Sequence, residues 1–171
     1  MRGHCSMYNF KEFLIKPAFS EQEKVVELFR EYTDMLVEND PVFASYLELQ
    51  NFDHELEDLQ KKYAPPKGRL FVAMLGEKAA GCIGLIDLNG EGCELKRLYV
   101  KPEYRGRGLA RELTRLILDE GKKAGYDYML LDTLPFLGAA QALYRSVGFY
   151  EIEKYNNSPM DNATYMRYDF K

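Results

Sequence analysis

Residues 94–110 of this 171-residue chain read ELKRLYVKPEYRGRGLA. The first half is rich in strand-forming residues and stops at Pro102, so it predicts a strand. A basic loop with Gly106 and Gly108 follows, and the next apolar residues recur at the spacing of one buried helix face: Leu109, Leu113, Leu116 and Ile117. Because the first amides of a helix lack partners and its dipole favours anions, the stretch predicts a loop that binds a phosphate or pyrophosphate.

The loop departs from two common phosphate-binding patterns. Arg111 stands where a dinucleotide fingerprint has its third glycine, and no Gly-Lys-Ser/Thr ending of a P-loop is present. The pattern Arg/Gln-x-x-Gly-x-Gly/Ala does match over 105–110, and this resembles the pyrophosphate loop of the GCN5-related N-acetyltransferase (GNAT) family. A second block, 140–150, resembles a later block of that family, an amphipathic helix that carries Leu143-Tyr144 and ends at Gly148-Phe149.

The resemblance implies an N-acetyltransferase that uses acetyl-CoA and no metal. The acceptor is a primary amine of a small molecule or amino-acid-like compound, which attacks directly in a ternary complex. The backbone of Leu98 and Val100 is expected to pair with the pantetheine arm like an added strand. The pyrophosphate is expected on the loop, which comprises Arg105, Gly106, Arg107, Gly108, Leu109 and Ala110.

Two residues are candidates for proton transfer. By resemblance, Tyr144 is the general acid for the leaving thiolate; the alternative is a packed tyrosine whose hydroxyl bonds a backbone carbonyl. Glu94 is the candidate base, alone or through water, because by resemblance it lies on the strand that borders the acetyl group. Strand alternation puts it on the face of Leu98 and Val100 unless a bulge intervenes. Its alternative is an ion pair with Lys96 or Arg97.

Two further positions qualify the match. Leu137 occupies a position where many relatives carry an asparagine that touches the cofactor. Cys93 is expected to be a small core residue rather than an acetylated nucleophile.

Composition bounds the class of protein. Hydrophobic residues make up 46% and charged residues 29%, which predicts one globular domain over residues 1–171. No apolar run approaches 18 residues, and residues 1–6 lack a signal-peptide core, so neither a membrane span nor secretion is expected.

Three scattered cysteines (Cys5, Cys82, Cys93) and two histidines (His4, His54) show no metal-ligand spacing and favour a cytoplasmic location with free thiols.

Charge is distributed unevenly along the chain. Residues 93–115 hold seven basic and three acidic side chains, whereas residues 1–63 hold 13 acidic and seven basic ones. This polarity suits an anionic cofactor at the loop and a cationic acceptor bound by the N-terminal helices and by residues 155–162. No basic face extends across the chain, so nucleic acid is not an expected partner. Assembly as a homodimer is left open.

The order of apolar patterns predicts the fold. Strands are expected at 12–16, 69–75, 80–88, 93–100, 127–133, 150–154 and 164–170. Helices are expected after a capping box at Ser20 and Glu23, from Pro41, along 52–63, and at 108–125 and 136–147. Together they form a mixed α/β (α+β) fold with a mostly antiparallel central sheet and helices on both faces. A protein acetyltransferase and a non-catalytic acyl-CoA sensor remain as alternatives.

Overall fold

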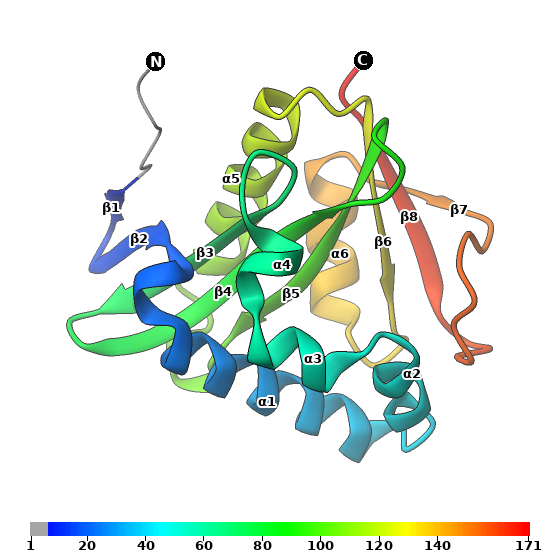
Figure 1. The fold of residues 1–171 in the computed structure, drawn as a ribbon, viewed down its shortest axis with the longest axis horizontal. Coiled ribbons are helices and arrows are strands. Elements are labelled where there is room, and N and C mark those ends of the chain that lie inside the picture. The colour runs from blue at the N-terminus through cyan, green and yellow to red at the C-terminus, as the bar shows by residue number, and fades with distance from the viewer. Residues whose placement is uncertain (1–6) are drawn as a thin grey trace.

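A computed structural model describes residues 7–171, which form one eight-stranded sheet in the order β1-β2-β3-β4-β5-β6-β8-β7 (Figure 1). Neighbouring strands are antiparallel except for β5 and β6, which are parallel. This confirms the predicted mixed, mostly antiparallel sheet. The strands are β1 (Tyr8–Phe10), β2 (Phe13–Pro17), β3 (Arg69–Leu75), β4 (Lys78–Asp87), β5 (Gly92–Val100), β6 (Tyr128–Thr133), β7 (Tyr150–Ile152) and β8 (Thr164–Asp169).

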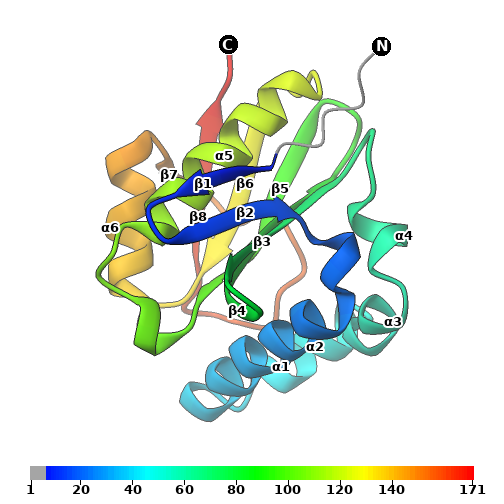
Figure 2. The same cartoon turned by 90° about the vertical axis from the view of Figure 1, so that its left-hand side faces the viewer.

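Helices cover both faces of the sheet (Figure 2). One layer comprises α1 (Gln22–Asn39), α2 (Phe43–Leu49), α3 (Phe52–Glu57) and α4 (Leu59–Tyr63); the other comprises α5 (Leu109–Lys123) and α6 (Gly138–Val147). The four residues that predicted the buried face of α5 are indeed buried: Leu109, Leu113, Leu116 and Ile117. No helix within residues 7–171 is long and apolar enough to cross a membrane.

Two predicted details of the helical layer are wrong, and one strand is missing from the prediction. Ser20 caps no helix, because it lies in a 3-10 turn and α1 begins later, without a side-chain cap. The helix expected over 52–63 is broken at Asp58, whose carboxylate accepts a hydrogen bond from the Lys61 amide and so begins a new helix. A short strand, β1, precedes β2 and was not predicted from the sequence.

A bulge in β5 changes which way its side chains face. Gly84 pairs with Lys96 and Cys82 with Tyr99, so two residues of β5 oppose one of β4, and Arg97 takes a left-handed φ of 59°. Leu98 and Val100 therefore pack toward α5, together with Cys93 and Leu95. Glu94 lies on the opposite face, and the expectation that it shares a face with Leu98 and Val100 is wrong.

The parallel pairing of β5 and β6 is short. It joins only three residue pairs, Gly92 with Tyr128, Cys93 with Met129 and Glu94 with Leu130. Beyond them β5 pairs with β4, and β6 pairs with β8. The two strands thus separate toward their C-terminal ends, and the sheet opens between residues 95–100 and residues 131–133.

Candidate functional site

A large cavity of the described chain, here called the long groove, lies at the C-terminal end of β5. Its volume is about 530 Å³, and its walls come from β5, the loop before α5, the starts of α5 and α6, and α1. It includes nearly all of the predicted cofactor-binding residues: Leu98, Val100, Arg105, Gly106, Gly108, Leu109 and Ala110. The segment that the sequence predicts to bind the cofactor therefore lines a cavity.

The loop before α5 has the geometry of an anion site. Gly106 and Gly108 have left-handed φ values of 78° and 81°, and Gly108 is the N-cap of α5. Among the described hydrogen bonds, none uses the amides of residues 109–111, as expected for a first helical turn. The Arg105 side chain donates from Nε to the Val100 carbonyl at 3.0 Å, which holds its cationic group beside the groove.

Arg107 does not line this groove with its side chain. Its Nη1 contacts Glu12 Oε1 at 2.6 Å, and its guanidinium lies over the Tyr104 ring. Its carbonyl accepts a hydrogen bond from Lys11 Nζ at 2.6 Å. Lys11 and Glu12 of the β1–β2 hairpin thus hold the outer side of the loop in place. Only the backbone of Arg107 is therefore available to an anion there.

A second cavity, here called the inner pocket, occupies the opening between β5 and β6. It is small, about 40 Å³, or room for roughly three waters. One wall is Leu95 to Leu98 of β5, and the other runs from Asp132 to Leu134 after β6. Side chains of α1 and α2 and of the β7–β8 loop close it: Tyr32, Leu36, Phe43, Tyr46, Gln50, Met160 and Ala163. Because Tyr32, Leu98 and Leu137 line both cavities, the pocket and the groove adjoin.

Tyr144 lines the inner pocket from α6. Its side chain is buried, and its ring packs edge-on against Phe149 at 5.7 Å. None of the described hydrogen bonds involves its hydroxyl, so the carbonyl-bonded alternative is not what the structure contains. Burial raises the pKa of Tyr144, with Tyr32 and Asp132 contributing in the same direction, and the hydroxyl keeps its proton at neutral pH.

Behind the pocket lies a buried ion-pair cluster around Glu55 of α3. Arg97 contacts Glu55 Oε2 through Nε at 3.0 Å, and Lys62 contacts Oε1 at 2.7 Å. Tyr63 donates a third hydrogen bond to the same carboxylate at 3.0 Å. Burial alone would raise the pKa of Glu55, but Arg97 and Lys62 outweigh it and lower that pKa to about 2.

Glu94 is held by its own neighbours. Its carboxylate accepts a hydrogen bond from the Tyr155 hydroxyl at 2.5 Å and lies 3.5 Å from Lys96 Nζ. Burial lowers the pKa of Lys96, and the Glu94 charge opposes that shift. Lys96 lines the inner pocket, whereas Glu94 is not among the lining residues. The ion-pair alternative for Glu94 is therefore present in the structure.

Asp132, a residue that sequence reasoning did not select, lies at the C-terminal end of β6 and lines the inner pocket. Its Oδ2 accepts hydrogen bonds from the Tyr46 hydroxyl at 2.5 Å and from Asn156 Nδ2 at 2.9 Å. Tyr46 belongs to α2 and Asn156 to the loop after β7, so three distant segments meet here. In the sequence, Asp132 is distinguished only as a polar residue that follows the apolar residues of β6.

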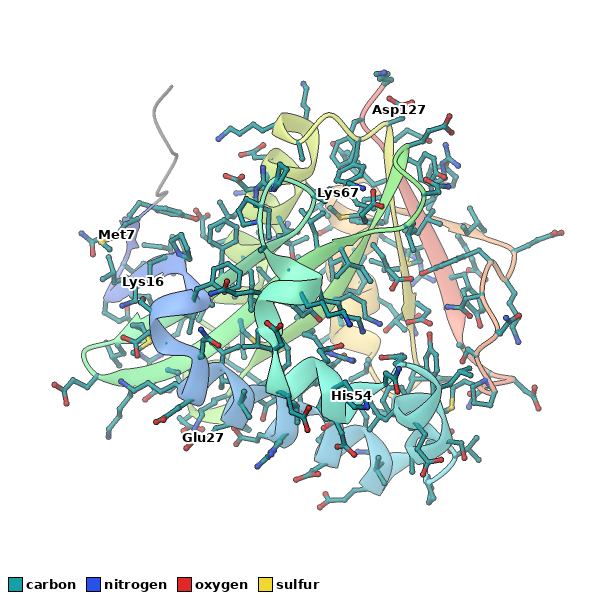
Figure 3. The ribbon with its side chains drawn as sticks, viewed as in Figure 1. Met7, Lys16, Glu27, His54, Lys67 and Asp127 are labelled. Carbon is teal, nitrogen blue, oxygen red and sulfur yellow. The ribbon has the colours of Figure 1, made fainter. Side chains whose placement is uncertain are left out.

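Cys82, Cys93 and His54 line neither of the two cavities. Burial raises the thiol pKa of Cys82 and of Cys93 to about 12, and both are free. His54 is exposed on α3 and lies 3.5 Å from Glu57 (Figure 3). Cys5 and His4, and the expected absence of a signal peptide, concern residues 1–6 and lie outside the described residues. Residues 7–171 contain no group of three or more His, Cys, Asp or Glu that could hold a metal ion.

The chain is similar in sequence and in fold to known acetyltransferases. The profile described as "Acetyltransferase (GNAT) family" matches residues 23–149. An uncharacterized N-acetyltransferase of Schizosaccharomyces pombe is 43% identical over 127 residues, which cover 73% of this chain and 78% of that protein.

Two solved structures illustrate the fold likeness. An acetyltransferase of Streptococcus agalactiae superposes with a TM-score of 0.76 at 19% identity, over 94% of this chain and all (100%) of that one. PaiA N-acetyltransferase of Thermoplasma acidophilum, solved in complex with coenzyme A, superposes with a TM-score of 0.69 at 18% identity, over 92% of this chain and 99% of that one. At these identities the likeness concerns the fold.

Proposed function

The chain belongs to the acetyltransferase (GNAT) family of N-acetyltransferases, and on this premise we propose that it transfers an acetyl group from acetyl-CoA to the primary amine of a small molecule. The observation that carries the proposal is the junction of the two cavities at Leu98 and Leu137. A donor in the long groove and an acceptor in the inner pocket would meet there. The proposal covers residues 1–171 as one domain, supported by the single sheet that all eight strands share.

The residues of the long groove fit acetyl-CoA. Unpartnered amides at the start of α5, with Arg105 and Arg111 beside them, suit a pyrophosphate. The backbone of Leu98 and Val100 borders the opening in the sheet, where an extended pantetheine arm could pair with β5 as β6 does further back. Arg107 contributes its backbone to this site, since its side chain is engaged by Glu12.

Tyr144 is proposed as the general acid. Acetyl-CoA supplies a thioester whose sulfur leaves as a thiolate, and a thiolate benefits from a nearby proton donor. The Tyr144 hydroxyl lines the inner pocket, stays protonated and has no partner among the described residues, which suits that role. Glu94 is proposed to act indirectly, by keeping Lys96 charged and orienting Tyr155, rather than by touching the acceptor.

The inner pocket favours a small acceptor over a protein. It is bounded by α1, α2, β5, the segment after β6 and the β7–β8 loop but is partly open, and only a compact amine end fits about 40 Å³. The acidic balance of residues 1–63 would attract a cation. The buried free thiols of Cys82 and Cys93 support the proposed cytoplasmic location.

A thiol-release assay with acetyl-CoA and parallel panels of small amines and lysine-containing peptides tests the function. We expect turnover with at least one small primary amine and none with the peptides. Turnover confined to the peptides would replace the small-molecule proposal with a protein acetyltransferase, and hydrolysis without any acceptor would contradict both.

Gly108→Val is expected to weaken acetyl-CoA binding at least tenfold. At a φ of 81°, a β-branched residue is strained and would rearrange the turn that presents the α5 amides. Gly125→Val is the matched control, since Gly125 has a φ of 91°, open surroundings and a place at the other end of α5. Calorimetry should show the loss of affinity for the first variant alone. Equal affinities for both variants would remove the loop from the binding site.

A further inference from the structure

Asp132 differs from the other carboxylates around the inner pocket in having no cation within salt-bridge distance among residues 7–171. Glu55 is contacted by Arg97 and Lys62, and Glu94 by Lys96. The two hydrogen-bond donors to Asp132, Tyr46 and Asn156, are both neutral. Lys96 lines the same pocket and attracts the Asp132 charge only from beyond that distance. A carboxylate that lines a pocket without an ion pair is suited to a ligand that supplies positive charge or an N–H donor.

The two oxygens of this carboxylate are used unequally. The bonds from Tyr46 and Asn156 both end on Oδ2, and none of the described hydrogen bonds ends on Oδ1. Two donors from different segments hold the group in one orientation, so its second oxygen is preorganised for an occupant of the pocket. The neighbouring Thr133 also lines the pocket, and its buried Oγ1 has no hydrogen-bond partner within residues 7–171.

Part of the pocket wall is apolar. Leu36, Phe43, Tyr46, Leu134 and Met160 line the pocket and form one packed cluster. Tyr144, on α6, lines the same pocket. The arrangement therefore combines one free carboxylate oxygen, an apolar wall and a protonated phenol within one small cavity.

We propose that Asp132 is the catalytic residue that binds the acceptor amine and receives its proton, and that the acceptor is a compact primary amine with an apolar group next to its aminomethyl end. The inference rests on the proposed function and names the substrate class and the base of that same site. It assigns to Asp132 the direct role that Glu94 does not fill, because Glu94 is engaged by Lys96 and Tyr155 and lies outside the lining of the pocket.

The proton transfers balance as follows. The amine enters as an ammonium ion, pairs with Asp132 Oδ1 and releases one proton to bulk water. The resulting neutral amine donates one N–H to Oδ1, which leaves its lone pair free for the acetyl carbonyl carbon. As the C–N bond forms, the nitrogen becomes cationic and Asp132 takes one of its protons. The C–S bond breaks, its electron pair leaves with sulfur, and Tyr144 gives its proton to that sulfur. Asp132 then returns its proton to the Tyr144 oxygen through water, so both residues recover and a neutral amide and thiol leave.

The test measures thiol release with n-butylamine, 2-phenylethylamine and glycinamide, together with acetyl-CoA affinity by calorimetry, for three variants. Asp132→Asn keeps the shape of the side chain but removes the base, and kcat/KM for the best amine should fall by about 10²–10⁴-fold. Asp132→Glu keeps the charge and should recover part of that loss. Glu77→Gln alters an exposed carboxylate in the turn between β3 and β4, which lines neither the groove nor the pocket, and should change nothing. Acetyl-CoA affinity should stay within about twofold in all three.

Three other outcomes would contradict the proposed role of Asp132. If the unchanged protein acetylates an amine and Asp132→Asn does so nearly as well, the assignment is wrong while the function stands. If Asp132→Asn loses acetyl-CoA affinity as strongly as turnover, Asp132 is a structural residue and the assignment is again wrong. If the unchanged protein acetylates none of the three amines, the small-amine function fails, and the role of Asp132 fails with it.

Discussion

Replacing Tyr144 with phenylalanine is expected to lower kcat at least about 10²-fold while leaving acetyl-CoA affinity nearly unchanged. The ring keeps its edge-on contact with Phe149. The variant loses only the hydroxyl, which engages none of the described residues and lines the inner pocket beside Leu98. A large loss of rate without a loss of binding is the signature of a group that acts in the chemical step.

The measurement needs a control for the removal of a buried hydroxyl. Tyr126→Phe provides one, because Tyr126 is buried before the start of β6 and its hydroxyl bonds Lys67 and Asp87, far along the strand from Asp132. It should cost about 1 kcal/mol of stability and leave kcat unchanged. Near-normal turnover of Tyr144→Phe, measured where chemistry limits the rate, would return Tyr144 to the role of a packed aromatic residue.

The largest expected loss of stability follows from Glu55→Gln. The change leaves the Arg97 guanidinium, whose side chain is only 3% exposed, without its anionic partner. Breaking one side of a buried pair typically costs about 3–5 kcal/mol, a large share of the stability of a domain. Urea unfolding at pH 7 measures the difference. Glu57→Gln on the same helix is the control, since Glu57 is 74% exposed and its ion pair contributes little.

The same pair makes stability depend on pH in a defined direction. The pKa of Glu55 is lowered to about 2 in the folded chain, from an ordinary value near 4.5. A lowered carboxylate pKa means that the ionised pair stabilises the fold above the ordinary pKa and that this stabilisation disappears as pH falls from about 5 to about 2. The gap in unfolding free energy between the unchanged protein and Glu55→Gln should narrow over that window. A gap that stays constant would contradict the assigned pKa.

The sequence predicts the fold well where local signals are strong. The strands around the loop were located to within two residues because strand-forming runs there end at proline or glycine, and the α5 stripe is regular. The predicted groove residues also follow from local features, since a strand, a glycine loop and a helix N-terminus are consecutive in the chain. Residues of such consecutive segments also lie close together in the folded chain.

The rest depends on contacts that no local pattern records. The bulge at Arg97 uses a left-handed arginine rather than a glycine, so nothing in the sequence marks the reversal of faces that separates Glu94 from Leu98. Arg97 is placed instead by Glu55, 42 residues away. Likewise, Asp132 acquires its orientation from Tyr46, 86 residues away, and from Asn156. The sequence alone could indicate the polar loop of residues 155–162, but not that its Asn156 contacts Asp132.

The short pairing of β5 with β6 divides the sheet into a five-stranded and a three-stranded part, joined by three residue pairs of backbone. Cohesion across the rest of this seam comes from side chains, including those of α5, which packs against strands on both sides. A molecule lying in the seam would therefore bridge the two parts as well as occupy a site. The ligand would therefore strengthen the connection between the two parts of the sheet at the place where their backbone pairing is shortest.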